Sequence, residues 1–366
     1  MTNPLTDLAL IARGILSEPT AQEDMPYRSM ILSCTREVHD QDALQIDSIA
    51  PQEDPQDFRA RLQSALDAYL ADTGSKPKSV CIKDLGSLVL KQDLPTSNLP
   101  LQNKVALVTG AAGAIGYGVC QVLLENGCFL AAGDLPGQKL DDFVTHLKKT
   151  APARVIALAM DVTREDSVEE GFGQIVRTWG GIDIVVVNAG IAHVCHLKDM
   201  DLEAFRRLER VNVEGTLLTL KVAAHSFLLQ GIGGDIVIMS TKNVPNPGAA
   251  FGAYSATKAA AHQLGRIASL ELAQYGVRVN MVAPDAVFAE GEYKSGLWQE
   301  VGPNRMKARG LDEQGLHEYY RDRNLLKARV TGRHVGNAVL FFVTHQTPTT
   351  RATIPVDGGL PEATPR

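Results

Sequence analysis

The sequence is poor in cysteine, in net positive charge and in long hydrophobic runs. Its five cysteines are an odd number without Cys-x-x-Cys spacing: Cys34, Cys81, Cys120, Cys128 and Cys195. This pattern argues against a disulfide framework and favours small buried side chains in a reducing compartment, so we expect a cytoplasmic protein. The net charge of −6 argues against nucleic acid as a partner, because phosphate contacts need a basic surface.

No apolar run approaches the roughly 20 residues that a membrane span requires, so we expect no contact with a membrane. The N-terminal segment lacks a basic region and a small-residue cleavage site, so we expect no signal peptide. The hydrophobic content of 45% and charged content of 21% are typical of a soluble globular enzyme. A chain of 366 residues fits either two to three domains or one large α/β domain with an extension.

The first hundred residues carry local structure but no catalytic constellation. Apolar spacing predicts an amphipathic helix within residues 1–30 and a second helix over 54–72. Two apolar runs, 79–82 and 87–90, flank Asp84-Leu85-Gly86 and predict a hairpin. Residues 95–100 form a linker bounded by prolines. We expect this extension to pack on the main domain or a neighbouring subunit; an independent ligand site and a flexible tail are the alternatives.

A different pattern begins at Lys104. Residues 105–109 form a short apolar run that suits a buried parallel strand, and the glycine-rich segment 110–116 precedes a helical pattern through Leu124. Glycines at such a strand-to-helix turn let the backbone approach a pyrophosphate at the N-terminus of the helix. The next strand ends in Asp134, about 20 residues beyond the turn, where a carboxylate binds ribose hydroxyls and repels a 2′-phosphate. The sequence therefore predicts NAD as the cofactor, with NADP less favoured.

Two further strands continue this alternation of strands and helices. The run 154–159 ends near Asp161-Val162, and the run 182–187 ends in Asn188-Ala189-Gly190. Strands that alternate with helices without a break predict an α/β fold, a doubly wound parallel sheet.

Tyr254 and Lys258 are four positions apart, which places them one turn from each other on the same face of a helix. The ammonium of Lys258 is expected to favour the phenolate of Tyr254 and to lower its pKa from about 10 toward neutrality. A tyrosine tuned in this way can exchange a proton with a substrate hydroxyl near pH 7.

Together these motifs resemble the short-chain dehydrogenase/reductase family over residues 101–360. The resemblance implies a Rossmann fold and a set of cofactor-binding residues: Gly110, Gly113, Ala114, Ile115, Gly116, Asp134, Asp161, Val162, Asn188, Ala189, Gly190, Tyr254, Lys258 and Pro284. It also implies a catalytic set, which is Asn212, Thr241, Tyr254 and Lys258, and no metal. Ala114 replaces a glycine of the family pattern, and its methyl group should slightly crowd the pyrophosphate.

The family usually has a serine thirteen positions before the tyrosine, where this chain has Thr241. Threonine keeps a hydroxyl that can donate and accept, and Ser240 is the alternative for this role. The resemblance places Asn212 in one helix over 202–229, where it would anchor a water that links Lys258 to solvent.

Several segments resemble one branch, the dehydrogenase half of bifunctional class II aldolase/short-chain dehydrogenases of the rhamnulose-phosphate aldolase/lactaldehyde dehydrogenase type, together with related sugar-alcohol dehydrogenases. These segments are Thr241-Lys242-Asn243, Pro284-Asp285-Ala286-Val287, Ser295-Gly296-Leu297-Trp298, Tyr319-Tyr320-Arg321 and Asn324-Leu325-Leu326-Lys327. The resemblance implies an N-terminal extension over 1–100, with a hairpin like the last part of such an aldolase. The zinc-binding histidines of the aldolase have no counterpart, so aldol cleavage is not expected.

The dehydrogenase domain, residues 101–366, would then interconvert a secondary alcohol and a ketone on a sugar, polyol or sugar phosphate. Residues 288–330 are expected to form a lid over the substrate. Candidate substrate contacts are Lys242, Asn243, Asp285 and Trp298, with His193 and His196 either near the pocket or on ordinary loops. The alternatives are oxidation of a small hydroxyaldehyde such as lactaldehyde, and an NAD(H)-binding regulator without activity. The resemblance implies a homodimer or homotetramer formed through helices 202–229 and 252–274.

Overall fold

The computed structural model describes residues 4–36, 43–48, 53–91, 98–290, 293 and 296–361. Residues 95–97 of the expected linker and residues 291, 292, 294 and 295 of the expected lid lie outside these residues.

A seven-stranded sheet forms the centre of the molecule, and its order is β13-β12-β11-β10-β7-β8-β9 with all neighbours parallel. Its strands are β7 (Val105–Thr109), β8 (Phe129–Asp134), β9 (Val155–Ala159), β10 (Ile184–Val187), β11 (Gly234–Met239), β12 (Val277–Pro284) and β13 (Thr353–Val356). The four strands predicted above, 105–109, the strand that ends in Asp134, 154–159 and 182–187, are confirmed within two residues, whereas β13 was not anticipated. Most of the strands in this sheet are short runs of apolar residues, and every residue of β7 and β10, for example, is buried.

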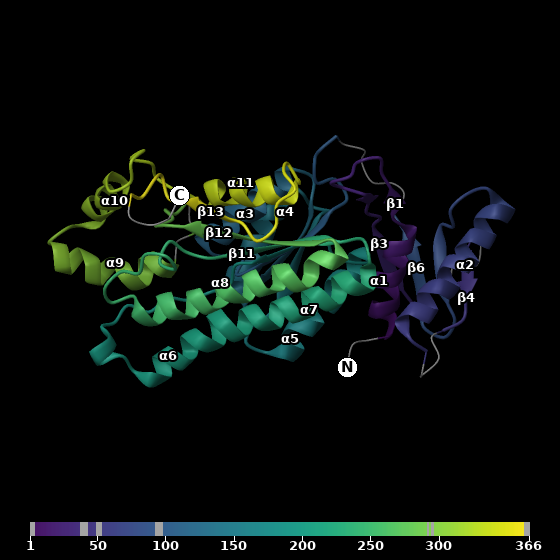
Figure 1. The fold of residues 1–366 in the computed structure, drawn as a ribbon, viewed down its shortest axis with the longest axis horizontal. Coiled ribbons are helices and arrows are strands. Elements are labelled where there is room, and N and C mark those ends of the chain that lie inside the picture. Colours follow the sequence, from purple (N-terminus) through teal and green to yellow (C-terminus); the bar gives the residue numbers. More distant parts are fainter. Residues whose placement is uncertain are drawn as a thin grey trace.

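Helices cover both faces of this sheet (Figure 1). On one face lie α3 (Ala114–Glu125), α4 (Gln138–Lys148) and α11 (Gly332–Val343), and on the other lie α5 (Glu165–Trp179), α7 (Gly215–Gln230) and α8 (Gly252–Leu272). This is the predicted doubly wound Rossmann fold. The strand order reverses between β7 and β10, and ligands of such sheets bind outside the carboxyl ends of the strands at that point.

The predicted single helix over 202–229 is wrong in its middle. It consists of α6 (Leu202–Glu209), a π-helical turn over Arg210–Glu214, and α7. The π turn inserts an extra residue into the helical repeat, and such turns occur most often at functional sites. It contains Asn212, whose side chain is fully buried.

The N-terminal extension has its own small sheet and core. Its elements are α1 (Pro4–Leu16), the strand pair β1 (Glu18–Pro19) and β2 (Tyr27–Arg28), α2 (Pro55–Thr73), and the sheet β3-β6-β5-β4 of Leu32–Thr35, Gly86–Leu90, Ser79–Ile82 and Ala43–Ile46. The predicted helices and the β5–β6 hairpin are confirmed, whereas β3 and β4 were not anticipated. In Figure 1 the extension lies at the end of the molecule opposite the lid helices α9 (Gly296–Arg309) and α10 (Glu313–Asp322).

The extension packs directly on the main domain. Val176 of α5 belongs to the apolar core of the extension. Arg13 of α1 is fully buried and donates a 2.7 Å hydrogen bond to the carboxylate of Asp183, which immediately precedes β10. Ser29 of the extension also donates to Asp183, at 2.5 Å. These contacts attach the extension to the amino-terminal edge of the main sheet, away from the carboxyl ends of its strands.

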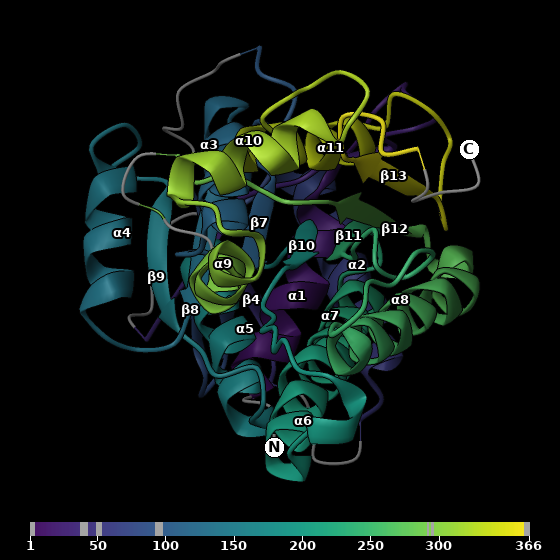
Figure 2. The same ribbon diagram turned by 90° about the vertical axis from the view of Figure 1, so that its left-hand side faces the viewer.

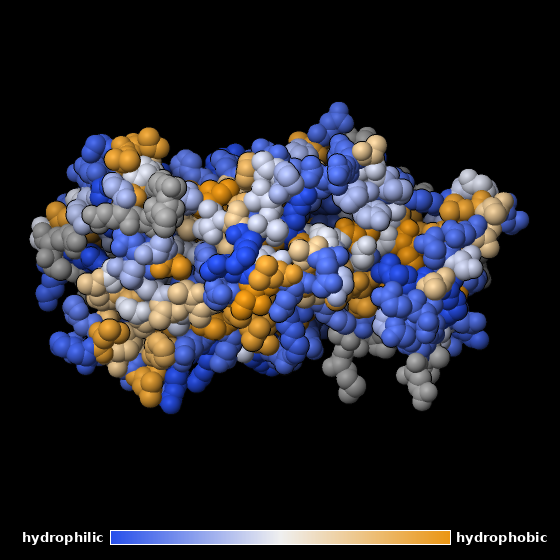
Figure 3. Space-filling view, viewed as in Figure 1, coloured by the Kyte–Doolittle hydropathy of each residue, from blue (hydrophilic) through white to orange (hydrophobic). Residues whose placement is uncertain are grey.

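Within the described residues, no helix is both long and apolar enough to cross a bilayer. Figure 3 shows apolar side chains gathered on the surface near the middle of α7 and α8. Leu217 of α7 and Ile267 and Leu270 of α8 are among the exposed large apolar residues.

Candidate active site

A cavity of 1410 Å³ opens at the carboxyl ends of the central strands. Its walls come from the turn after β7, the ends of β8, β10, β11 and β12, and the lid. Seen from this end, α9 lies between α10 and α6 (Figure 2). The volume exceeds the roughly 300–1,000 Å³ of a typical ligand pocket, so it can hold a dinucleotide and a second molecule.

The turn between β7 and α3 requires glycine at two positions. Gly110 has a φ of +62°, and a Cβ there would lie 2.8 Å from the Cα of Ala189. A Cβ on Gly116 would lie 2.5 Å from the carbonyl oxygens of Gly110 and Ala111. Gly113 precedes the first turn of α3, which begins at Ala114 and includes Ile115. This bare backbone at a helix N-terminus fits a pyrophosphate.

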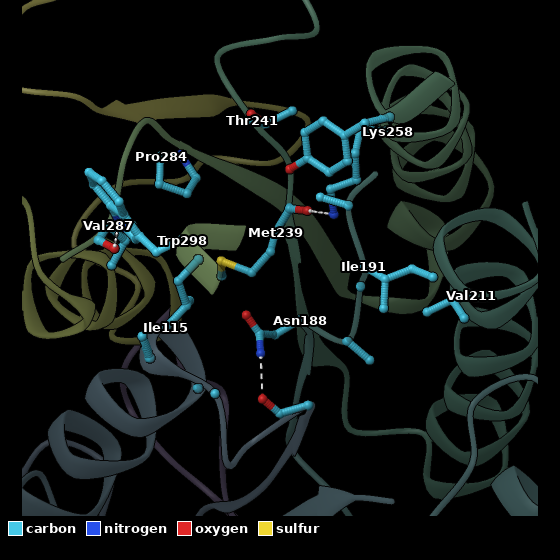
Figure 4. A pocket seen from close by; sticks show the side chains of 18 of the residues that line it. Ile115, Asn188, Ile191, Val211, Met239, Thr241, Lys258, Pro284, Val287 and Trp298 are labelled. Atoms are coloured by element: carbon cyan, nitrogen blue, oxygen red, sulfur yellow. Dashed lines mark hydrogen bonds between the residues drawn. The ribbon is translucent and has the colours of Figure 1, made fainter. Parts of the chain in front are cut away.

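The side chain of Asn188, which follows β10, links the end of that strand to the end of β7. Its side-chain nitrogen donates to the carbonyl oxygens of Thr109 and Gly110, each at 2.9 Å. The Thr109 hydroxyl in turn accepts from the backbone nitrogens of Asn188 and Ala189. The Asn188-Ala189-Gly190 segment is thereby fixed beside the glycine turn (Figure 4).

Two carboxylates, those of Asp134 and Asp161, line the end of the cavity beyond the glycine turn. Asp134, the last residue of β8, accepts from the backbone nitrogen of Ala112 at 2.9 Å and lines the cavity. Asp161 also lines the cavity, and its carboxylate accepts from the backbone and hydroxyl of Thr163. Val162 is buried next to it. Asp134 is held beside the glycine turn by its bond to Ala112.

Thr241, Tyr254 and Lys258 meet at the opposite part of the same cavity, with Pro284 nearby. The Thr241 side chain lies close enough to the phenol of Tyr254 to lower the pKa of the phenol. Lys258 Nζ donates at 2.6 Å to the carbonyl oxygen of Met239, at the end of β11 (Figure 4). The packing of α8 against β11 therefore brings Tyr254 and Lys258 close to Thr241, which precedes them by thirteen and seventeen positions.

The expected lowering of the Tyr254 pKa is wrong for this structure. Burial raises the pKa of Tyr254 to about 12; Asp285 adds to the rise, and the side chain of Thr241 opposes it. Burial also lowers the pKa of Lys258 to about 8. The physical reason is that the ammonium is engaged by the Met239 carbonyl, so desolvation of the phenol is not compensated.

The two candidate hydroxyls have different neighbours. Ser240 is hydrogen-bonded through its Oγ to Nδ1 of His262 at 2.8 Å. Thr241 contacts Tyr254. Of the two side chains, that of Thr241 is the one that affects the pKa of the phenol.

Asn212 lies close to Lys258. Its Oδ1 accepts from the backbone nitrogen of Ile191 at 2.9 Å, and its Nδ2 donates to the Ile191 carbonyl and to the Thr257 hydroxyl. A Cβ on Gly190 would lie 3.1 Å from Asn212 Oδ1 and 3.6 Å from Lys258 Nζ, so both groups face the same small space.

On the side of the cavity next to residues 288–330, several side chains are engaged by contacts within the protein. Trp298 donates from its indole nitrogen to the Val287 carbonyl at 2.8 Å, and its ring packs on those of His317 and Tyr320. Asp285 forms an ion pair with Arg323. Trp298 and Asp285 are therefore less available to a substrate than the sequence suggests.

Three polar side chains from loops complete this wall. Lys242 lines the cavity and donates to the carbonyl oxygen of Asn246 at 3.4 Å. Asn243 is buried, and its Oδ1 has no hydrogen-bond partner among the described residues. His193 lines the cavity, whereas His196 is exposed and lies outside it.

Sequence reasoning missed Phe251, which lines the cavity beside Tyr254 with ring centroids 6.3 Å apart. The sequence signal that could have identified Phe251 was its position at the start of the helix that carries Tyr254 and Ser255. Among the residues that the structure describes, no group of three or more His, Cys, Asp or Glu side chains is arranged to hold a metal.

The parallel sheet, the glycine turn and the cavity with its Tyr–Lys pair define a dinucleotide-dependent oxidoreductase. The family profile described as short chain dehydrogenase matches residues 104–299. The chain belongs to the short-chain dehydrogenase/reductase family and is an oxidoreductase that acts on CH–OH groups. Members of this family generally bind NAD or NADP.

Two curated relatives and one solved structure illustrate the similarity. The uncharacterized oxidoreductase YuxG of Bacillus subtilis is 32% identical over 275 residues, which are 75% of this chain and 40% of YuxG. A sorbitol dehydrogenase of Cereibacter sphaeroides is 32% identical over 197 residues, 54% of this chain and 75% of that enzyme. The crystal structure of a short-chain dehydrogenase/reductase from Mycobacterium marinum has a TM-score of 0.62 at 28% identity and covers 71% of this chain and 96% of its own.

This chain thus spans well under two thirds of the length of YuxG. The alignment with YuxG covers a slightly larger share of this chain than residues 101–366 do, so it extends a few residues into the N-terminal extension.

Proposed function

We propose that this protein is an NAD-dependent dehydrogenase that interconverts a secondary alcohol and a ketone on a sugar, polyol or sugar phosphate. The observation that carries the proposal is that Thr241, Tyr254 and Lys258 line one cavity, where the Thr241 side chain lies close enough to the phenol of Tyr254 to affect its pKa.

The preference for NAD over NADP rests on Asp134. Its carboxylate ends β8 beside the glycine turn and is already oriented by the backbone of Ala112. A negative charge at this place accepts hydrogen bonds from a ribose and repels a 2′-phosphate.

In alcohol oxidation the substrate hydroxyl gives its proton to the phenolate of Tyr254, while the carbinol carbon loses a hydride. Bound NAD supplies the acceptor for that hydride. Thr241 holds the reacting oxygen through its hydroxyl, which can donate and accept. In ketone reduction Tyr254 returns the proton to the carbonyl oxygen.

Lys258 and Asn212 support this proton exchange. Lys258 lies one helical turn from Tyr254, but its ammonium is bonded to the Met239 carbonyl and the pKa of Tyr254 is raised, so the positive charge of bound NAD is needed to favour the phenolate. Asn212 Oδ1 and Lys258 Nζ face the same small space, which suits a water that carries protons between Lys258 and solvent.

Asn243 supports a substrate with several hydroxyl groups. Its Oδ1 is buried in the cavity wall without a donor from the residues that the structure describes, and leaving such an oxygen unsatisfied costs about 1–3 kcal/mol. A substrate hydroxyl would remove that cost. Lys242 adds a positive charge to the same wall, and the similarity to a sorbitol dehydrogenase agrees with a polyol.

We also propose that residues 1–100 derive from an aldolase domain and now serve packing. Support comes from the partial overlap of the extension with the alignment to the much longer YuxG. A homodimer or homotetramer through α7 and α8 is proposed because Leu217, Ile267 and Leu270 expose apolar surface there. Light scattering at micromolar concentration tests this assembly, and a monomer would contradict it.

The test of the proposed function is NADH formation from NAD with a panel of sorbitol, other sugar alcohols, their phosphates, and lactaldehyde. We expect turnover on one group of sugar alcohols or their phosphates, and slower turnover when NADP replaces NAD. Oxidation of lactaldehyde alone would replace the proposal with its alternative. NADH binding without any turnover would favour a regulator.

A further inference from the structure

We propose that Arg305 forms an anion-binding subsite in the lid wall of the cavity and selects substrates that carry a phosphate or carboxylate group away from the reacting carbinol. This inference rests on the proposed function for its polyol scaffold, but anion binding at Arg305 can be measured without turnover.

Arg305 is the cavity-lining arginine of α9, and it is half-buried. Its guanidinium lies 5.1 Å from the centre of the Phe251 ring, which holds it against the cavity wall. Within the described part of the chain, no carboxylate forms an ion pair with Arg305. Among the residues that the structure describes, the partner of its charge is thus a ring face and not a carboxylate.

Arg323 provides the contrast within the same cavity. It also lies over an aromatic ring, with its guanidinium 4.4 Å from the centre of Tyr320. Unlike Arg305, it is paired with a carboxylate, that of Asp285. The Arg323 charge is therefore compensated by Asp285, whereas no described carboxylate compensates the Arg305 charge, which is available to an anionic ligand.

The position of Arg305 relative to the reacting centre suits a substrate with an anionic end. Phe251 contacts both Arg305 and Tyr254, with separations of 5.1 Å and 6.3 Å, so the guanidinium lies within about 11 Å of the Tyr254 ring. A chain of a few carbon atoms spans such a distance. The same molecule can then place a carbinol at Tyr254 and an anionic group at Arg305.

A guanidinium presents parallel N–H donors that match two oxygens of a phosphate or carboxylate. A substrate that fills the cavity displaces water from Arg305, and removing water from a charge is costly unless an opposite charge replaces it. An anionic substrate meets this requirement, whereas a neutral polyol does not. Lys242 lines the same cavity, and its positive charge also favours an anionic ligand.

The test is calorimetric binding of sorbitol, sorbitol 6-phosphate and gluconate to the full-length protein saturated with NADH, a combination that cannot turn over. We expect sorbitol 6-phosphate or gluconate to bind at least tenfold more tightly than sorbitol, as hydrogen bonds to a charged group would give. The tighter of the two identifies the anionic group.

Arg305→Gln should remove at least tenfold of this affinity for the anionic ligand and change that for sorbitol by less than about twofold. Arg329→Gln is the matched control, because Arg329 lies 5.2 Å from the Phe288 ring centre but does not line the cavity. It should leave all three affinities unchanged. NADH binding by each variant verifies its fold.

Equal affinities for sorbitol and both anionic ligands, or a preference that persists in Arg305→Gln, would overturn the subsite. If sorbitol is oxidised but no anion preference exists, the subsite fails alone. If anionic ligands bind through Arg305 and no alcohol is oxidised, the subsite stands and the proposed dehydrogenase function fails.

Discussion

Lys258 donates a 2.6 Å hydrogen bond to the carbonyl oxygen of Met239, the last residue of β11. This bond ties α8 to the strand that leads into Thr241, and so fixes the hydroxyl of Thr241 beside Tyr254. It also directs the ammonium to a neutral carbonyl. The pKa of Tyr254 is therefore raised by burial, and that of Lys258 is lowered for the same reason.

The lowered pKa of Lys258 predicts a specific pH dependence of stability. Between about pH 8 and pH 10.5 the unfolded chain holds a proton that the folded protein lacks, so folding stability should rise with pH across this window. Lys258→Met should remove this rise and stabilise the protein at pH 7 by up to about 3 kcal/mol, while abolishing activity. Urea unfolding of both proteins at pH 7 and 9.5 measures the difference. A variant that is less stable than wild type at pH 7 would contradict the prediction.

The raised pKa of Tyr254 predicts that its phenol stays protonated in the cofactor-free protein. Ultraviolet difference titration of wild type against Tyr254→Phe should show no tyrosinate from residue 254 below about pH 10, since the pKa is about 12. Addition of NAD should lower the midpoint, because a positive charge beside the phenol favours the phenolate. A midpoint near pH 7 without cofactor would refute this view of the site.

The different partners of Ser240 and Thr241 predict which hydroxyl acts. Thr241→Val keeps the side-chain volume but removes the hydroxyl, and it should reduce kcat by roughly 100-fold or more. Thr241→Ser should stay within about threefold of wild type, because the hydroxyl remains. Ser240→Ala is the comparison and should retain most activity, since Ser240 bonds to His262. A larger loss in Ser240→Ala than in Thr241→Val would reverse the assignment.

Asp134 should decide between the two dinucleotides. Asp134→Asn keeps an oxygen that can accept from Ala112 but removes the negative charge. We expect the ratio of kcat/KM for NAD to that for NADP to fall by at least about tenfold, because the repulsion of the 2′-phosphate is lost. An unchanged ratio would mean that another residue sets the preference.

The buried contact between Arg13 and Asp183 should contribute strongly to stability. Burial raises the pKa of Asp183, but Arg13, Lys104 and the bond from Ser29 outweigh this and leave the pKa lowered. Arg13→Met leaves a buried carboxylate without its main partner and should destabilise the protein by about 3–5 kcal/mol. The double variant Arg13→Met/Asp183→Asn should recover part of the loss in urea unfolding. No recovery would indicate that Arg13 acts through packing alone.

Strands β7 to β10 were predicted well because each is a short run of mostly apolar residues, whereas β13 (TIPV) offered no such run and was missed. The glycine turn was equally accessible, since Gly110 and Gly116 are required by their own local geometry. The π turn at Asn212 was not predictable, because its apolar pattern continues that of the helices on both sides. The lysine contact to Met239 was also missed, since it depends on how β11 packs against α8.

In the extension, the helices and the hairpin were predicted from local spacing. Strand β3 was missed because it pairs with β6 at a separation of more than fifty residues, and β4 because it pairs with β5 across α2. The lid contacts of Trp298 and Asp285 depend in the same way on distant partners, Val287 and Arg323.

The most direct test of the account is the turnover of Tyr254→Phe with NAD and the best alcohol of the panel, measured beside its affinity for NADH. The account predicts a loss of kcat of at least about 100-fold with NADH affinity within about threefold of wild type, because only the proton-transferring hydroxyl is removed. Turnover within tenfold of wild type would contradict the assignment of Tyr254 as the group that exchanges the proton.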